Sequence, residues 1–320
     1  MKLSIITINR NNAEGLRRTM ESVFAQTYRD FEYIIVDGAS TDGSVDVIRE
    51  YESVNHSSIN PLTVSWISEP DTGIYNAMNK GIEIASGLRV VDAFNRSELS
   101  EDKNKGVNRS EFIEDKNKDL PEYILMLNSG DFLVDERVIE RIMPELHTED
   151  MIQGNLIEDY PDKTIRNRGY GRSDISFIDA MDADFPHQAM FIKLSTMAQY
   201  GYYDESYKKG SDTYFFITAL GFGNATYRYV DIDVTNFDVN GISSMQDPRW
   251  WKIDQEEDAR WYGEHISKRL WDLYQTAPKK ILLYDQLHKN KFIWKLTMGL
   301  VRLSEWLSPK EENVKNERIK

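Results

Sequence analysis

The sequence predicts an α/β fold with a mostly parallel central sheet and helices on its faces. Short β-branched apolar runs alternate with amphipathic helical patterns along the first half of the chain, and this alternation is typical of a parallel sheet. Aspartates follow three of the runs, at Asp37, Asp71 and Asp131. Because ligands bind beyond the carboxyl ends of such strands, we expect these three loops to form one site.

The individual elements follow from residue spacing. Leu16, Met20 and Val23 recur at helical intervals after the first apolar run, and the run at 74–85 repeats this pattern. The expected strands cover residues 3–8, 31–36, 62–67, 123–127, 151–157 and 189–192. The expected helices cover residues 16–24, 44–51, 74–85, 138–146 and 213–220.

Two segments depart from this alternation. Residues 88–122 are polar and mixed in charge with little periodicity, and we interpret them as an insert, either a solvated surface loop or a flap. From about Asp247 the chain becomes helical in pattern and rich in tryptophan. The sequence therefore predicts a main α/β domain over residues 1–245 and a helical C-terminal extension over residues 246–320.

Composition excludes several classes of protein. The formal net charge of −14 argues against a general nucleic-acid binder, which needs clustered Lys and Arg. The absence of cysteine excludes disulfides and thiolate chemistry. The N-terminal apolar run is too short for a signal peptide, and no run of about 18 apolar residues predicts a spanning helix. We therefore expect a cytoplasmic protein.

Three loop motifs resemble those of a known family. They are Val36–Ser44, the stretch Ser68–Gly81 with its Ser-Glu-Pro-Asp and Asn-Lys-Gly, and Leu127–Asp131. At these residues the chain resembles the family-2 glycosyltransferases, which have the GT-A fold. The resemblance covers roughly residues 1–245 and points to a subgroup that builds bacterial surface polysaccharides of the colanic-acid type. It implies inverting transfer of a sugar from a nucleotide diphosphate, with UDP as the expected nucleotide, to a glycan or lipid-linked glycan.

Such a transfer needs a cation or fixed donors for the leaving diphosphate, a base for the acceptor hydroxyl and a pocket for the nucleoside. The resemblance assigns the nucleobase to Asp37, whose carboxylate would accept a charge-assisted hydrogen bond from an imide N–H. It assigns further donor contacts to Asn9, Arg10, Asp71, Asn79 and Lys80. Asn9 and Arg10 replace the usual Thr and Tyr, and the plain alternative is a polar helix start.

Asp131 occupies the metal position of the family. The segment Asn128–Asp131 stands where an Asp-x-Asp motif is usual, and only Asp131 remains as a carboxylate. One carboxylate together with diphosphate oxygens can hold Mg²⁺ or Mn²⁺. The alternative role for Asp131 is to cap the next helix.

The catalytic base is expected at Asp212. It matches the second residue of the family's Glu-Asp pair, with Ser211 in place of Glu, although a helix N-cap would use the same residue type. His187 lies in a loop that the family places near the acceptor, and we expect an acceptor contact there. A lone histidine is more often a hydrogen-bonded structural residue.

The C-terminal segment 279–302 interleaves Lys and Arg with aromatic and aliphatic residues. It could lie on the inner face of an anionic membrane, pack on the body, or contact a second copy of the chain. Two rival functions remain at this point. A nucleotidyltransferase would share a similar sheet but needs a Gly-rich basic loop after the first strand. A non-catalytic carbohydrate-binding protein would fit the altered Asn128–Asp131 motif.

Overall fold

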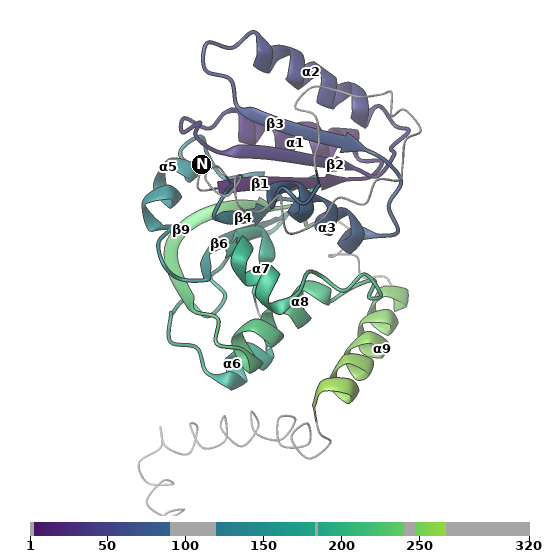
Figure 1. Cartoon of the computed structure of the whole chain (residues 1–320), viewed down its shortest axis with the longest axis vertical. Helices are drawn as coiled ribbons and strands as arrows, with labels where there is room; N and C mark the ends of the chain where they lie inside the picture. The colour runs from purple at the N-terminus through teal and green to yellow at the C-terminus, as the bar shows by residue number, and fades with distance from the viewer. Residues whose placement is uncertain (1–2, 90–119, 183–184, 240–247, 267–320) are drawn as a thin grey trace, which may run out of the picture. The chain divides into compact units, whose positions relative to one another are not determined.

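The computed structural model describes residues 3–89, 120–182, 185–239 and 248–266 (Figure 1). The chain divides into two compact units, Met1–Asp258 and Ala259–Lys320. Most of the expected insert and the whole of segment 279–302 lie outside the described residues. Among the residues described, no helix combines the length and apolar character needed to cross a bilayer.

A mixed sheet forms the centre of the first unit, and the predicted α/β class is confirmed. Its strands lie in the order β3-β2-β1-β4-β8-β6-β9-β5, with β7 paired to β6. The first four are parallel to one another, whereas β8 is antiparallel to both β4 and β6. The strands are β1 (Leu3–Asn9), β2 (Glu32–Asp37), β3 (Thr63–Ser68), β4 (Tyr123–Met126), β5 (Phe132–Leu133), β6 (Met151–Tyr160), β7 (Lys163–Asn167), β8 (Met190–Lys193) and β9 (Tyr227–Phe237).

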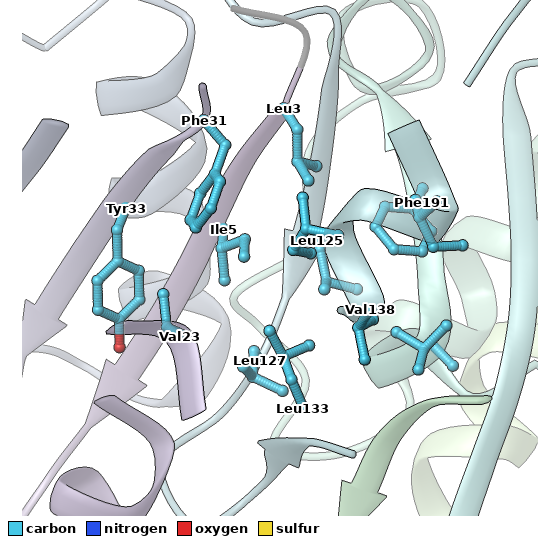
Figure 2. Packing of buried hydrophobic residues seen from close by; sticks show 14 of the residues in the cluster. Leu3, Ile5, Val23, Phe31, Tyr33, Leu125, Leu127, Leu133, Val138 and Phe191 are labelled. Carbon is cyan, nitrogen blue, oxygen red and sulfur yellow. The ribbon is translucent and has the colours of Figure 1, made fainter. Parts of the chain in front are cut away.

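Alternating residues of the parallel strands face opposite sides of the sheet. On one side Leu3, Tyr33 and Leu125 pack into a core with Val23 of α1 and Val138 of α5 (Figure 2). On the other side helix α3 approaches so closely that a Cβ on Gly81 would lie 2.4 Å from Ile6 Cγ2. Helices therefore cover both faces and leave the strand ends for the site.

The helices follow the predicted order with shifted ends. They are α1 (Ala13–Phe24), α2 (Ser44–His56), α3 (Ile74–Ala85), α5 (Val138–Ile142), α6 (Phe177–Asp182), α7 (Leu194–Tyr200), α8 (Ser211–Phe216) and α9 (Pro248–His265). The helix expected over 138–146 ends at Ile142 and continues as a 3₁₀ turn that contains Pro144, because proline restricts the α-helical geometry. The helix expected at 213–220 begins at Ser211 and widens into a π-helix over Ile217–Phe222.

Candidate active site

The loops after β1, β2, β3 and β4 are joined at the carboxyl edge of the parallel sheet. Gly38 N donates to Asn9 O at 2.8 Å, and Glu69 N donates to Asp37 O at 3.0 Å. On the other side of β1, Ser129 N donates to Ile8 O at 3.0 Å. These backbone bonds extend the strand pairing into the loops and give the site a fixed edge.

Asp37 is completely buried at this edge, and its carboxylate accepts four hydrogen bonds. Asn9 Nδ2 and Ser40 Oγ donate to Oδ1 at 2.8 and 2.5 Å, while Ser40 N and Ser68 Oγ donate to Oδ2 at 2.9 and 2.6 Å. A carboxylate offers about four lone-pair sites. Asp37 thus joins the ends of β1 and β3 to its own loop through these hydrogen bonds. Its expected contact with the nucleobase stays a prediction, and these bonds do not favour it.

The remaining expected donor residues fall into two groups. Arg10 Nη1 contacts Asp71 Oδ1 at 3.2 Å above this edge. Asn79 faces the loop before α8, whereas Lys80 contacts the loop that carries Asp71. Asn79 Nδ2 donates to Tyr203 O at 2.7 Å and to a Glu205 carboxylate oxygen at 2.9 Å, which docks the loop before α8 onto α3.

Lys80 pairs with the loop that follows β3. Its Nζ lies 2.8 Å from Glu69 Oε1 and donates to Pro70 O at 2.8 Å. A direct donor contact from Lys80 or Asn79 stays a prediction, since the structure gives both side chains protein partners.

Asp131 lies in the turn after β4 and is only 3% exposed. Its Oδ1 accepts from Asp238 N at 2.9 Å. Burial raises the pKa of Asp131 to about 6, and the nearby Asp238 carboxylate adds to the rise. Helix α5 begins only at Val138, so the alternative that Asp131 caps the following helix is wrong.

Asp212 is held by two side chains from distant parts of the chain. Tyr75 Oη donates to Oδ1 at 2.9 Å, and His187 Nδ1 lies 2.7 Å from Oδ2. Burial alone would raise the pKa of this carboxyl, but the hydrogen bonds from His187 and Tyr75 outweigh it and lower the pKa to about 2. Gly210 is the N-cap of α8, so the alternative of Asp212 as that cap is wrong.

His187 joins Asp212 to the turn that carries Asp131. Its Nε2 lies 3.2 Å from Asn128 Nδ2, and its side chain is 13% exposed. Burial acts to lower the pKa of His187, but the Asp212 carboxylate outweighs it and raises the pKa above its ordinary value. Both ring nitrogens have protein partners. This arrangement favours a positioning role for His187, and the expected acceptor contact stays a prediction.

The structure thus brings Asp131 and Asp212 together through Asn128 and His187. Asp37 lies at the end of β2, which β1 separates from β4, and no hydrogen bond joins it to either aspartate among the described residues. Sequence reasoning missed Tyr75 and treated Asn128 only as a lost acid. The signal for Tyr75 was its place at the start of α3, two residues after the turn glycine Gly73.

The residues around Asp131 fit a hard divalent cation in part. Asn128 Oδ1 is buried and accepts no hydrogen bond from the described residues, and carboxylate and amide oxygens are ligands that Mg²⁺ and Mn²⁺ prefer. No group of three or more His, Cys, Asp or Glu side chains suited to a metal occurs in the described ranges. Asp131 and Asn128 would therefore hold the ion together with oxygens of a bound diphosphate.

This mixed sheet flanked by helices, with carboxylates beyond its strand ends, has a GT-A-like architecture. The family model described as glycosyl transferase family 2 matches residues 4–91. An uncharacterized glycosyltransferase, MT1564 of Mycobacterium tuberculosis, is 29% identical over 251 residues, which are 77% of this chain and 78% of the relative. The chain is thus similar to glycosyl transferase family 2 at residues 4–91 and to a glycosyltransferase over most of its length, and the resemblance seen in the sequence is confirmed.

Two solved structures share the fold. One is Staphylococcus aureus TarS 1–349 in complex with UDP-GlcNAc, with a TM-score of 0.51 and 14% identity over 74% of this chain and 58% of TarS. The other is the mannosyltransferase PcManGT of Pyrobaculum calidifontis in complex with GDP-Man and Mn²⁺, with a TM-score of 0.52 and 13% identity over 83% of this chain and 64% of that chain. At these identities the likeness concerns the fold alone, and the chain spans less than two thirds of either neighbour.

Proposed function

We propose that the protein is an inverting glycosyltransferase that moves a hexosyl or N-acetylhexosaminyl group from a UDP-sugar to a hydroxyl of a glycan or lipid-linked glycan. The proposed pathway is the synthesis of a bacterial surface polysaccharide of the colanic-acid type. The observation that carries the reaction is the Asp212 carboxylate, fixed by Tyr75 and His187 close to the Asp131 turn. One positioned base with no second nucleophile in the described site suits a single displacement.

In the proposed step the acceptor oxygen bonds to the anomeric carbon as the bond to the diphosphate oxygen breaks. The acceptor proton passes to Asp212, whose side chain is 16% exposed. Its oxygens accept from Tyr75, from His187 and from the backbone of Thr213, which leaves one of the about four lone-pair sites of a carboxylate for the acceptor hydroxyl. A carboxylate whose pKa is near 2 is a weak base, so proton transfer would accompany bond formation and not precede it.

Asp131 and Asn128 serve the leaving group in this proposal. A bound Mg²⁺ or Mn²⁺ supplies positive charge against the departing diphosphate. The protein's own contribution is a carboxylate kept out of water, at 3% exposure, where its interactions are less screened than at the surface. The Mn²⁺ present in PcManGT supports this choice of ion.

The direct test is incubation with candidate nucleotide sugars and Mn²⁺, followed by analysis of the released products. Nucleoside diphosphate with inversion at the anomeric carbon supports the proposal. Pyrophosphate would instead identify the rival nucleotidyltransferase, and binding without turnover would identify a carbohydrate-binding protein. The single Arg10 after β1, without a glycine cluster, argues against the nucleotidyltransferase.

We also propose that the catalytic domain ends near residue 245 and that the extension over 246–320 brings the enzyme to the inner face of the cell membrane. The basic and aromatic composition of segment 279–302 supports this placement. Co-sedimentation with anionic liposomes should fall on truncation after residue 278. If binding is unchanged, the membrane contact is wrong, and light scattering of the same two proteins tests the alternative of a dimer contact.

A further inference from the structure

Helix α9 contacts the loop that leads to Asp212. The contacts come from residues 248–258, the first half of the helix, which belong to the first compact unit. This half lies beyond residue 245, where the sequence placed the end of the α/β domain. The loop runs from Gly201 to Gly210 and enters α8, in which Asp212 is the second residue. Contacts at this place bear directly on where the Asp212 carboxylate lies.

Glu257 of α9 binds the backbone of this loop with both carboxylate oxygens. Lys208 N donates to Oε1 at 2.7 Å, and Lys209 N donates to Oε2 at 2.8 Å. Hydrogen bonds to an ionised acceptor are the stronger kind, and two at once also fix the orientation of the groups that they join. The Lys209 side chain adds an ion pair with Asp254 at 3.0 Å, but the two side chains are 35% and 38% exposed, so this pair contributes little.

The same helix also holds the first turn of α8. Tyr214 Oη donates to Asp258 Oδ1 at 2.9 Å, and Tyr214 N donates to Gly210 O at 2.9 Å. The Tyr214 ring lies against Gly210, where an added Cβ would come within 3.1 Å of it. Gly210 has a φ of +80°, which favours glycine and reverses the chain at this point. Asp212 thus lies between a segment bound by Glu257 and a residue bound by Asp258.

A second anchor holds the other end of the loop. Asn79 of α3 exchanges two hydrogen bonds with the backbone of Tyr203, at 2.7 and 3.1 Å. Helix α3 also carries Tyr75, which donates to Asp212 at 2.9 Å, while His187 lies 2.7 Å from the second oxygen of Asp212. Since the loop is bound to α3 at one end and to α9 at the other, both contacts set the distances from Asp212 to these two partners.

We propose that Glu257, together with Asp258, is a positioning residue for Asp212, so that the first half of α9 is part of the functional site. The inference rests on the proposed function in taking Asp212 as the group that receives the acceptor proton. Glu257 acts through the backbone of Lys208 and Lys209 and needs no contact with either substrate. A misplacement of about 1 Å far from the reacting atoms can slow a reaction by as much as about 10²-fold.

The first readout of the test needs no substrate. NMR titration of the full chain follows the His187 ring, whose signal is identified by its loss in His187→Phe. In the wild-type protein the Asp212 carboxylate keeps the pKa of His187 above its ordinary value, against the effect of burial. Glu257→Ala should loosen Asp212 from His187 and shift this pKa downward. Glu257→Gln keeps one acceptor oxygen and should produce a smaller shift.

Glu256→Ala is the matched control. It removes the same side chain from the neighbouring position of α9, where Glu256 lies 3.5 Å from Lys252 and both side chains are largely exposed. The titration of His187 should be the same in this variant as in the wild-type protein. A general effect of lost charge or lost helix stability would appear in Glu256→Ala as well.

The second readout is the rate of sugar transfer from the donor that product analysis identifies. Glu257→Ala should lower kcat about 10-fold and keep the donor KM within about 2-fold, because the base moves while the donor contacts remain. Tyr214→Phe removes the hydroxyl that binds Asp258 but keeps the ring. It should change kcat and the His187 titration in the same direction, and it is the variant to use if Glu257→Ala does not fold.

The inference is overturned if Glu257→Ala lowers only the melting temperature and leaves the His187 titration and kcat as in the wild-type protein. It is also overturned if Glu256→Ala has effects equal to those of Glu257→Ala. Wild-type protein that transfers no sugar from any nucleotide sugar contradicts the proposed function instead. The titration of His187 would then still decide whether α9 positions Asp212.

Discussion

The contact between His187 and Asp212 gives a quantitative prediction about the charge state of the site. Asp212 has its pKa lowered from 3.8 to about 2 in the folded protein, which corresponds to about 2 kcal/mol at 1.36 kcal/mol per unit. Both side chains are largely buried, at 13% and 16% exposure, so solvent screens the pair little. Tyr75 shares in this net shift and burial opposes it, so a double-mutant cycle with His187→Phe and Asp212→Asn should give the coupling of a hydrogen bond to a charged group, about 1.5 to 3 kcal/mol at pH 5.5.

The coupling should depend on pH in a definite direction. The lowered pKa of Asp212 contributes stability that is present above about pH 4 and lost as the pH falls toward 2. The raised pKa of His187 contributes stability that is full below about pH 6.5, its ordinary value, and is lost as the pH rises through the higher pKa of the folded protein. Both contributions are present at pH 5.5, and the histidine part declines above the raised pKa of His187, so the coupling should be smaller at pH 9.

Urea unfolding of the four proteins at pH 5.5 and pH 9 measures the coupling at both values. The exposed pair of Arg17 and Glu50, at 2.6 Å, is the control. Its cycle should give a much smaller coupling that is equal at the two pH values, because solvent screens the exposed pair and both groups keep their charges. A coupling below about 0.5 kcal/mol at pH 5.5, or an equal coupling at pH 9, would refute the ion pair and with it the positioning role of His187.

Three further predictions concern single residues. Tyr75→Phe removes one of the two side-chain donors to Asp212 and should lower kcat about 10-fold with donor KM unchanged; a change in KM alone contradicts this role. Because the pKa of Asp131 is about 6, Mn²⁺ affinity should weaken as the pH falls below 6, and titration calorimetry should show this dependence vanish in Asp131→Asn. Asn79→Ala leaves the buried N–H and C=O groups of Tyr203 without their hydrogen-bond partner. The free energy of unfolding, measured in urea, should fall by about 2 kcal/mol. An unaltered unfolding midpoint would show that Asn79 does not hold this loop.

The parallel half of the sheet could be predicted from the sequence because its strands are short apolar runs. Residues 3–8 and 31–36 have almost no polar interruption, and both faces of these strands are covered by helices. Strand β9 was not predicted. Its sequence places Asp231 and Asp233 among apolar residues, and only pairing with β6 and β5 reveals it as a strand.

The site could be predicted in part. Motifs singled out Asp131 and Asp212 as candidates, and the structure links the turn of Asp131 to Asp212 through Asn128 and His187. The rule for strand ends predicted that Asp37 and Asp71 lie at one edge, and both follow adjacent strands. The hydrogen-bond partners of Asp212 could not be predicted from the sequence, because Tyr75 lies 137 residues before Asp212 in the chain. Only the packing of α3 against the loop before α8 brings the two together. Likewise, the contact between Asn128 and His187 could not be predicted, because no local sequence pattern connects the two residues.

The most direct measurement of the central claim is the rate of sugar transfer by Asp212→Asn in the presence of Mn²⁺ and saturating donor. Loss of the general base should slow sugar transfer by about 10²- to 10⁴-fold. The variant should still bind the nucleotide, and its melting temperature should still show a folded enzyme. A folded Asp212→Asn protein that transfers sugar at the wild-type rate would contradict the claim that this carboxylate takes the acceptor proton.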